Sequence, residues 1–119
     1  MSKLLFAETH EWAKVEGNVA TIGISDHAQH ELGDLVFINL PAVGDEITAK
    51  ETFCDVESVK AVSDVMAPVS GKVIEVNEEL ESAPELINSD AFAAWICKVE
   101  VTEVPADLMD EAKYAEFIK

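Results

Sequence analysis

Prolines and glycines spread along the whole chain divide it into short segments of β-type sequence. Six of these segments are rich in β-branched and aromatic residues: Val19–Ile24, Leu35–Leu40, Phe53–Glu57, Val62–Met66, Val73–Val76 and Trp95–Val101. Short strands separated by turn residues at this spacing are typical of a sandwich or a barrel. The pattern therefore predicts an all-β fold.

The last of these segments shows the alternation of a half-buried strand. Side chains of successive strand residues point to opposite faces of a sheet. We therefore expect one face of this strand to be buried and the other to face solvent. The buried face would carry Trp95, Cys97, Val99 and Val101, and the exposed face Ile96, Lys98 and Glu100. Turns are predicted at Glu16-Gly17-Asn18 and Val43-Gly44-Asp45, since glycine, asparagine and aspartate tolerate positive φ.

Helices are predicted in three places. Ser25 is a candidate N-cap for a helix that ends at Gly33. A C-terminal helix, about residues 106–118, follows Pro105, with Asp107 as its candidate N-cap. Its apolar residues recur at helical spacing, at Leu108, Ala112, Ala115 and Ile118. A further turn of helix is expected at Glu85-Leu86-Ile87.

Charge and length exclude several classes of function. The 119 residues contain 24 acidic and 8 basic residues, which gives a formal net charge of −16. A basic face for nucleic acid is therefore not expected, and anionic membranes would repel the chain. The sequence contains no apolar run near the ~20 residues of a membrane span, and its N-terminal apolar stretch is too short for a signal peptide. We expect a single acidic domain, residues 1–119, in the cytoplasm.

Several kinds of chemical site have little support. The sequence has no phosphate-binding glycine motif and no Gly-x-Ser-x-Gly elbow. Cys54 and Cys97 lack a CxxC spacing, so we interpret them as reduced structural cysteines and not as nucleophiles. His27 and His30, with Glu31 beside them, could supply metal ligands from one helix face. We favour a structural interpretation of these side chains and expect no metal.

One acidic stretch and one lysine remain. The stretch is interpreted as a solvated loop; it contains Glu78, Glu79, Glu81 and Glu85. Lys60 lies between two β-type runs, Thr52–Glu57 and Ala61–Met66, that leave almost no loop. Lys60 is therefore predicted at the tip of a tight β-turn. From the residues alone, an exposed lysine there is usually a solubilising charge.

The residues around Lys60 carry a family resemblance that changes this interpretation. The motif is Glu57-Ser58-Val59-Lys60-Ala61, followed by Ser63-Asp64 and by Ala67-Pro68-Val69-Ser70-Gly71. Further segments that match the same pattern occur in order along nearly the whole chain. They are His10-Glu11-Trp12, Val19–Ile24, Ala28-Gln29, Leu32-Gly33-Asp34, Val36-Phe37, Leu40-Pro41, Gly44-Asp45, Gly71–Asn77 and Pro84–Asn88. This pattern resembles the glycine cleavage system H protein family.

The resemblance implies a fold and a function. The implied fold is a hybrid barrel-sandwich of the lipoyl/biotinyl type, with two antiparallel sheets, short helices and a C-terminal helix. Lipoate would be attached to Lys60 through an amide bond. The chain would then be a non-catalytic carrier that takes an aminomethyl group from glycine decarboxylase, the P protein, to the aminomethyltransferase, the T protein. Dihydrolipoyl dehydrogenase, the L protein, would reoxidise the dithiol. Lipoyl-attaching enzymes are further expected partners, and a monomer is expected.

The family also implies a cleft that shields the loaded, cationic arm. By position, Thr9, Glu11 and Asp64 would line it, and carboxylates suit an ammonium group. Some family members have a histidine where this chain has Glu31, and His30 precedes that position by one residue. One step along a helix rotates a side chain by about 100°, so His30 is not expected to replace that histidine.

The chain departs from the family at two further places. Cys54 stands where the family usually has glycine. Ala91, Ala93 and Ala94 replace glycines before Trp95. Because alanine resists positive φ, we expect this loop to take another path.

Two alternative functions remain open at the level of sequence. One is an H-like protein that relays lipoate to other acceptors or serves redox signalling. The other is a binding module in which Lys60 is never acylated and the acidic surface alone is functional.

Overall fold

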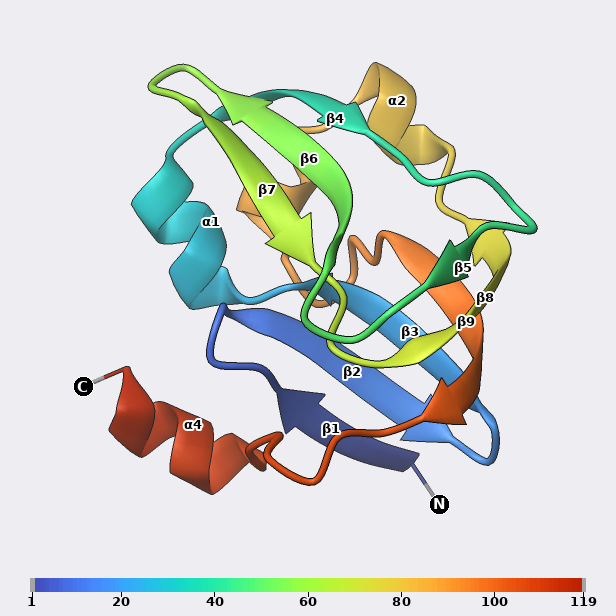
Figure 1. The fold of residues 1–119 in the computed structure, drawn as a ribbon. Helices are drawn as coiled ribbons and strands as arrows, with labels where there is room; N and C mark the ends of the chain where they lie inside the picture. The colour runs from blue at the N-terminus through green and yellow to red at the C-terminus, as the bar shows by residue number, and fades with distance from the viewer. Residues whose placement is uncertain (1, 119) are drawn as a thin grey trace.

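The computed structural model describes residues 2–118, which form two antiparallel sheets with short helices around them (Figure 1). The larger sheet has six strands in the order β1-β2-β3-β9-β8-β5. They are β1 (Ser2–Phe6), β2 (Glu11–Glu16), β3 (Val19–Ile24), β9 (Cys97–Glu103), β8 (Ser70–Val76) and β5 (Glu46–Ile47). The smaller sheet has three strands, β4 (Leu35–Asn39), β6 (Thr52–Ser58) and β7 (Val62–Met66).

The main core is formed by the inward faces of both sheets. Its fully buried side chains include Ile22 of β3, Ile38 of β4, Val56 of β6 and Val99 of β9. Each comes from a strand with alternating or continuous apolar sequence, so one apolar face of each sheet is removed from water. The predicted all-β fold of two antiparallel sheets is confirmed.

Within residues 2–118, four short helices accompany the sheets. They are α1 (Asp26–Leu32), α2 (Glu79–Ser82), α3 (Leu86–Ser89) and α4 (Glu111–Phe117). Ser25 caps α1 as predicted, because its hydroxyl oxygen accepts a hydrogen bond from Ala28 N at 3.1 Å. Gly33 ends this helix with φ of 84°. Figure 1 shows α1 beside the β6–β7 hairpin and α4 beside β1.

The C-terminal helix begins later than predicted. Its N-cap is Asp110, whose carboxylate accepts from Lys113 N at 2.8 Å, and not Asp107. Asp107 is instead paired with Lys50, at 2.6 Å between Nζ and Oδ2. Residues 106–110 are held by β1, since the backbones of Phe6 and Met109 exchange two hydrogen bonds. Ala106 and Asp107 form a turn before this bridge, and the helix begins only after Asp110.

Other expectations differ from the structure in detail. Strands β1, β2 and β5 were not among the predicted segments. Ile96, expected on an exposed face, is fully buried, because the strand begins only at Cys97. The acidic stretch is solvated but not a plain loop, since α2 lies within it and buries Leu80.

The loop before Trp95 follows a path that suits alanine. Its turn is held by Asp90, whose Oδ1 accepts from Phe92 N and Ala93 N, each at 3.2 Å. Ala94 N donates to Asp90 O at 3.0 Å. Ala91, Ala93 and Ala94 all have negative φ in the structure. The loop therefore needs no residue with the freedom of glycine.

Candidate functional site

Lys60 lies at the tip of the hairpin formed by β6 and β7, called here the Lys60 hairpin (residues 52–66). Glu57 and Val62 are the last paired residues of its two strands. Ser58 N then donates to Ala61 O at 2.8 Å, which closes a four-residue turn with Val59 and Lys60 at its centre. Both central residues are exposed. The predicted position of Lys60 at a tight turn is therefore what the structure shows.

The side chain of Ser58 stabilises this turn from inside. Its hydroxyl oxygen accepts from Lys60 N at 3.2 Å and from Ala61 N at 3.1 Å, and its hydroxyl group donates to Ala61 O at 3.2 Å. Ser58 itself is buried. Outside the turn, Val59 N donates to Asp34 O at 3.0 Å. The backbone of the tip is thus fixed, while the lysine side chain points away from the core.

The lysine side chain lies over the end of α1. Lys60 Nζ donates to Glu31 O at 3.3 Å, and a Cβ atom built on Gly33 would lie only 3.0 Å from Lys60 Cε. Glycine at position 33 leaves room for this lysine and also adopts the positive φ that ends the helix. The amide of Asn88 in α3 holds this corner by donating to Gly33 O and accepting from Leu35 N.

Exposed apolar side chains surround the tip. Phe37, Glu57 and Val62 are consecutive cross-strand partners, so they share the outward face of the small sheet. Val62 is 62% exposed and Val59 67% exposed. Of the motif neighbours predicted with Lys60, only Ser58 is therefore directed inward. Glu57, Val59 and Ala61 lie on the surface around the lysine.

A second group of predicted residues meets at a small cleft beside α1. Thr9, Glu11 and Asp64 all border one cavity of about 150 Å³, called here the Glu11 cleft. It lies between the β1–β2 loop, α1 and the Lys60 hairpin. Its other lining residues are His10, Ile24, Ala28, Glu31, Leu32, Val56, Ser63 and Val65.

Glu11 is the buried carboxylate of this cleft, with an exposed fraction of 3%. The Thr9 hydroxyl group donates to Glu11 Oε1, and Met66 N donates to Glu11 Oε2 at 3.3 Å. Burial raises the pKa of Glu11 to about 7, and these two hydrogen bonds hold it lower than burial alone would. The carboxylate is thus held by the β1–β2 loop on one oxygen and by the end of β7 on the other.

The three predicted cleft residues do not have equal positions. Asp64 is exposed and pairs with Asp55, so it lies on the outward face of β7, opposite Ser63 and Val65. Asp64 therefore borders the cleft at its rim. His10 and Glu31 also line the cleft and were not predicted as site residues. A signal for His10 was present, since it stands between Thr9 and Glu11.

The three histidines do not share one site. His30 lines another cavity, beside Phe6 and Tyr114, and does not contribute to the Glu11 cleft. His27 Nε2 lies 3.8 Å from Glu31 Oε1, and its ring centroid is 4.7 Å from that of His10. Within residues 2–118, no group of three or more histidine, cysteine or acidic side chains is arranged to hold a metal ion.

Both cysteines belong to the core. Cys54 and Cys97 are free and buried. Burial raises the pKa of both thiols well above the ordinary value, so neither is an activated nucleophile at neutral pH. Cys54 fills the inward face of β6, which places this departure from the family pattern in the packing and not at the tip.

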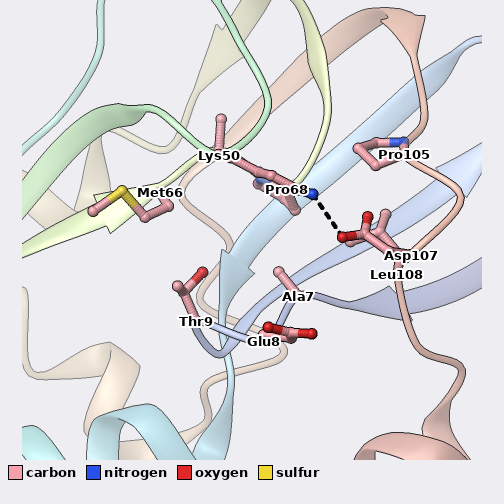
Figure 2. Close-up of a pocket in the computed structure, with 10 residues that line it drawn as sticks. Ala7, Glu8, Thr9, Lys50, Met66, Pro68, Pro105, Asp107 and Leu108 are labelled. Atoms are coloured by element: carbon pink, nitrogen blue, oxygen red, sulfur yellow. Dashed lines mark hydrogen bonds and ion pairs between the residues drawn. The ribbon is translucent and has the colours of Figure 1, made fainter.

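Thr9 also lines a further pocket, which Figure 2 shows. It has a volume of about 220 Å³ and is roofed by the ion pair between Lys50 and Asp107. Its walls come from the β1–β2 loop, the end of β7 and the segment before α4, and include Met66, Pro68 and Pro105. Nothing in the sequence pattern singled out this pocket.

The described helices are all short. Across residues 2–118, none of them combines the length and the apolar character that a membrane span requires.

Comparison with known proteins agrees with the geometry. The profile of the glycine cleavage H-protein family matches residues 4–119. The glycine cleavage system H protein of Alkaliphilus oremlandii is 60% identical over 117 residues, which cover 96% of this chain and 91% of that protein. The H protein of Treponema denticola is 55% identical over 114 residues, covering 96% and 93%.

A solved structure gives the same result. The crystal structure of a glycine cleavage system H protein from Mycobacterium marinum superposes with a TM-score of 0.89 at 36% identity, covering 96% of this chain and 94% of that one. The match in sequence and in fold extends over almost all of both chains. This chain therefore belongs to the glycine cleavage H-protein family, the non-catalytic lipoyl carriers that move between the P, T and L proteins.

Proposed function

We propose that Lys60 is the lysine of this chain that carries the lipoyl group. The observation that carries this proposal is its position at the centre of a rigid, exposed turn. An attaching enzyme needs the amine to extend beyond the protein surface, and the Ser58 hydrogen bonds keep the turn from folding back. Lys60 Nζ donates to a backbone carbonyl, Glu31 O, and forms no ion pair with any residue of 2–118, so acylation would not break one there.

The attached group would supply a dithiolane that accepts and releases an aminomethyl unit. The chain's own contribution is presentation and shelter. A tethered arm stays at high effective concentration near a docked partner. The amide bond would also remove the charge of Lys60 and move the formal net charge from −16 to −17.

We further propose that the Glu11 cleft holds the cationic end of the arm. Glu31 links the two regions, because its backbone carbonyl contacts Lys60 Nζ and it also lines the cleft. Glu11 and Glu31 supply carboxylates for an ammonium group, and Ile24, Val56 and Val65 supply apolar surface for the hydrocarbon. Binding of a cation would stabilise the ionised form of Glu11.

The remaining expectations form part of the same proposal. One domain is supported by the radius of gyration of 13.0 Å, close to the ~13.5 Å of a compact chain of this length. We propose that the chain acts as a monomer in the cytoplasm and that lipoyl-attaching enzymes are among its partners. Two unpaired cysteines suit a reducing compartment.

The attachment site is tested by intact-mass measurement after co-expression with a lipoyl-attaching enzyme. We expect wild type to gain the mass of one lipoyl group and Lys60→Arg to gain none. The matched control is Lys72→Arg, which changes an exposed lysine of β8. It should be modified like wild type. Modification of Lys60→Arg, or none in wild type, would contradict the proposal.

A further inference from the structure

The C-terminal helix is connected to the Glu11 cleft through one side chain, Tyr114. Its ring is stacked on Phe6, with centroids 4.2 Å apart and an interplanar angle of 4°. Its hydroxyl oxygen lies 2.8 Å from His10 Nδ1 and 2.7 Å from Ser25 Oγ. The residue is buried although α4 is otherwise largely exposed. The hydroxyl group thus reaches beyond the stacking contact, to the β1–β2 loop and to the cap of α1.

The hydroxyl group completes a closed set of three contacts. Ser25 N donates to His10 O at 2.8 Å, so His10 and Ser25 are joined by their backbones as well as through Tyr114. Ser25 Oγ already accepts from Ala28 N as the cap of α1. Its hydroxyl group is therefore free to donate to the Tyr114 oxygen, and Tyr114 to donate to His10 Nδ1. In this arrangement His10 is neutral and carries its proton on Nε2.

The state of His10 agrees with this arrangement. Burial and the neighbouring His27 lower the pKa of His10, while Glu31 acts in the opposite direction to a smaller extent. Its ring also lies 6.0 Å from that of Phe117. A lowered pKa favours the neutral imidazole that can accept a hydrogen bond from Tyr114.

His10 has a backbone conformation that needs support. Its φ of 78° is in the left-handed region, which few residues other than glycine adopt. This conformation turns the chain sharply between Thr9 and Glu11. The turn brings the Thr9 hydroxyl group onto the Glu11 carboxylate and directs both side chains to the cleft. A contact that holds the His10 ring in place therefore also holds the two residues beside it.

We propose that Tyr114 is a positioning residue for the Glu11 cleft. Its hydroxyl group holds His10, and His10 holds the loop that carries Thr9 and Glu11. The C-terminal helix thereby determines how well the cleft retains a cationic group. The functional meaning of this inference rests on the proposed role of the cleft, whereas the contacts themselves are independent of lipoylation.

The first test uses the unlipoylated full-length chain and NMR titration of the Glu11 carboxyl carbon. Tyr114→Phe keeps the stacking on Phe6 and removes only the hydroxyl group. We expect the Glu11 midpoint to fall by about one pH unit toward the ordinary value as the loosened loop admits water. The ring nitrogens of His10 should at the same time lose the signature of a single tautomer. Lys113→Gln, an exposed change in the same helix, should leave both signals unchanged.

A second variant separates the hydrogen bond from the backbone conformation. His10→Gly adopts positive φ without strain and has no side chain that could reach the tyrosine. It should shift the Glu11 midpoint as Tyr114→Phe does, and the double variant should shift it no further, because both variants lose the same contact between His10 and Tyr114. Additive shifts of the Glu11 midpoint in the double variant would overturn the proposal. It would also be overturned if Tyr114→Phe had the Glu11 midpoint of wild type and unchanged amide signals of Thr9 and Glu11.

The functional readout is the lifetime of the loaded, lipoylated chain without the aminomethyltransferase. Loss of one net hydrogen bond corresponds to about a fivefold change in an equilibrium, so Tyr114→Phe should shorten this lifetime about fivefold. An unchanged lifetime would overturn the positioning role. If Lys60 is never lipoylated, the proposed function fails, whereas the titration of the unmodified chain still decides whether Tyr114 positions Glu11.

Discussion

The Lys60 hairpin and the Glu11 cleft lie on either side of the end of α1, but the chain builds them in opposite ways. The hairpin tip is made from consecutive residues, and its hydrogen bonds join positions 58, 60 and 61. The cleft is made from four segments that are far apart in sequence. The tip exposes a charged side chain, whereas the cleft buries one.

This difference follows from what each region has to do. The lysine that we propose for lipoylation has to be accessible to an attaching enzyme and to partners, and a local turn gives access at low cost in ordering. A group that retains a ligand needs desolvation, which strengthens electrostatic attraction. Desolvation also makes an ionised carboxylate costly, so the buried Glu11 favours ligand binding but lowers the free energy of unfolding.

The largest expected effect is on stability, and it distinguishes a substitution of the buried carboxylate, Glu11, from a substitution of an exposed one. The pKa of Glu11 is about 7 in the folded protein and 4.5 ordinarily. The folded protein therefore holds an extra proton between these values, and its stability falls as pH rises from about 4.5 to about 7. Glu11→Gln is neutral at every pH. At pH 8 its free energy of unfolding should exceed that of wild type by an amount on the order of 3 kcal/mol.

Chemical denaturation at pH 4 and pH 8 measures this effect. The two proteins should have nearly equal stability at pH 4. Glu57→Gln at the exposed hairpin end is the matched control and should differ from wild type by less than about 0.5 kcal/mol at both pH values. If Glu11→Gln were less stable than wild type at pH 8, the cost of burying the ionised carboxylate would not be the dominant contribution of Glu11 to stability.

A smaller effect on stability is expected at Ser58, whose side chain holds the turn at Lys60. Ser58→Ala removes a hydroxyl group that makes three hydrogen bonds within the turn. The expected loss is about 1 kcal/mol in the free energy of unfolding, because intramolecular hydrogen bonds replace bonds to water. Lipoylation should also be slower, since the lysine is presented by a looser turn. Denaturant midpoints and a modification time course measure the two effects.

The control for this variant is Ser89→Ala. Ser89 is an exposed serine of α3 whose hydroxyl group makes one long contact with Glu85 O, at 3.5 Å. It should leave stability and lipoylation almost unchanged. Equal behaviour of the two alanine variants would mean that the turn at Lys60 does not depend on Ser58.

The smallest effect is expected at Lys60 itself. Lys60→Gln removes the positive charge, as acylation would, and leaves the turn intact. The free energy of unfolding should change by less than about 0.5 kcal/mol, as is usual for surface substitutions. Thermal and chemical denaturation check this value. A loss above 1 kcal/mol would show that the lysine supports the fold, and the distinction between an exposed tip and a buried cleft would then be weaker.

The sequence was informative where structure is local. The tip turn was predicted from two β-type runs that leave no loop between them, and Ser25 was recognised as a cap from its position before a helix. Asp107 was misassigned because the backbone of Met109 pairs with Phe6, more than a hundred residues away. Ile96 was assigned to the wrong face because the sequence pattern does not mark where the strand begins.

The cleft could not have been assembled from patterns in the sequence. Thr9, Glu11 and Asp64 were named only from the family resemblance, and the register that places Asp64 on the rim depends on pairing with Asp55. His10 was part of a matched motif, but its role depends on positive φ and on Tyr114, which no local pattern reveals. Long-range contacts determine this region, whereas short-range contacts close the turn at the tip.

Localisation of the modification tests the central claim most directly. The lipoylated chain would be digested and its peptides fragmented by mass spectrometry. The account predicts that the mass of one lipoyl group lies on Lys60, between Val59 and Ala61, and on no other lysine. A lipoyl group on any of the other lysines of the chain, with Lys60 unmodified, would contradict it.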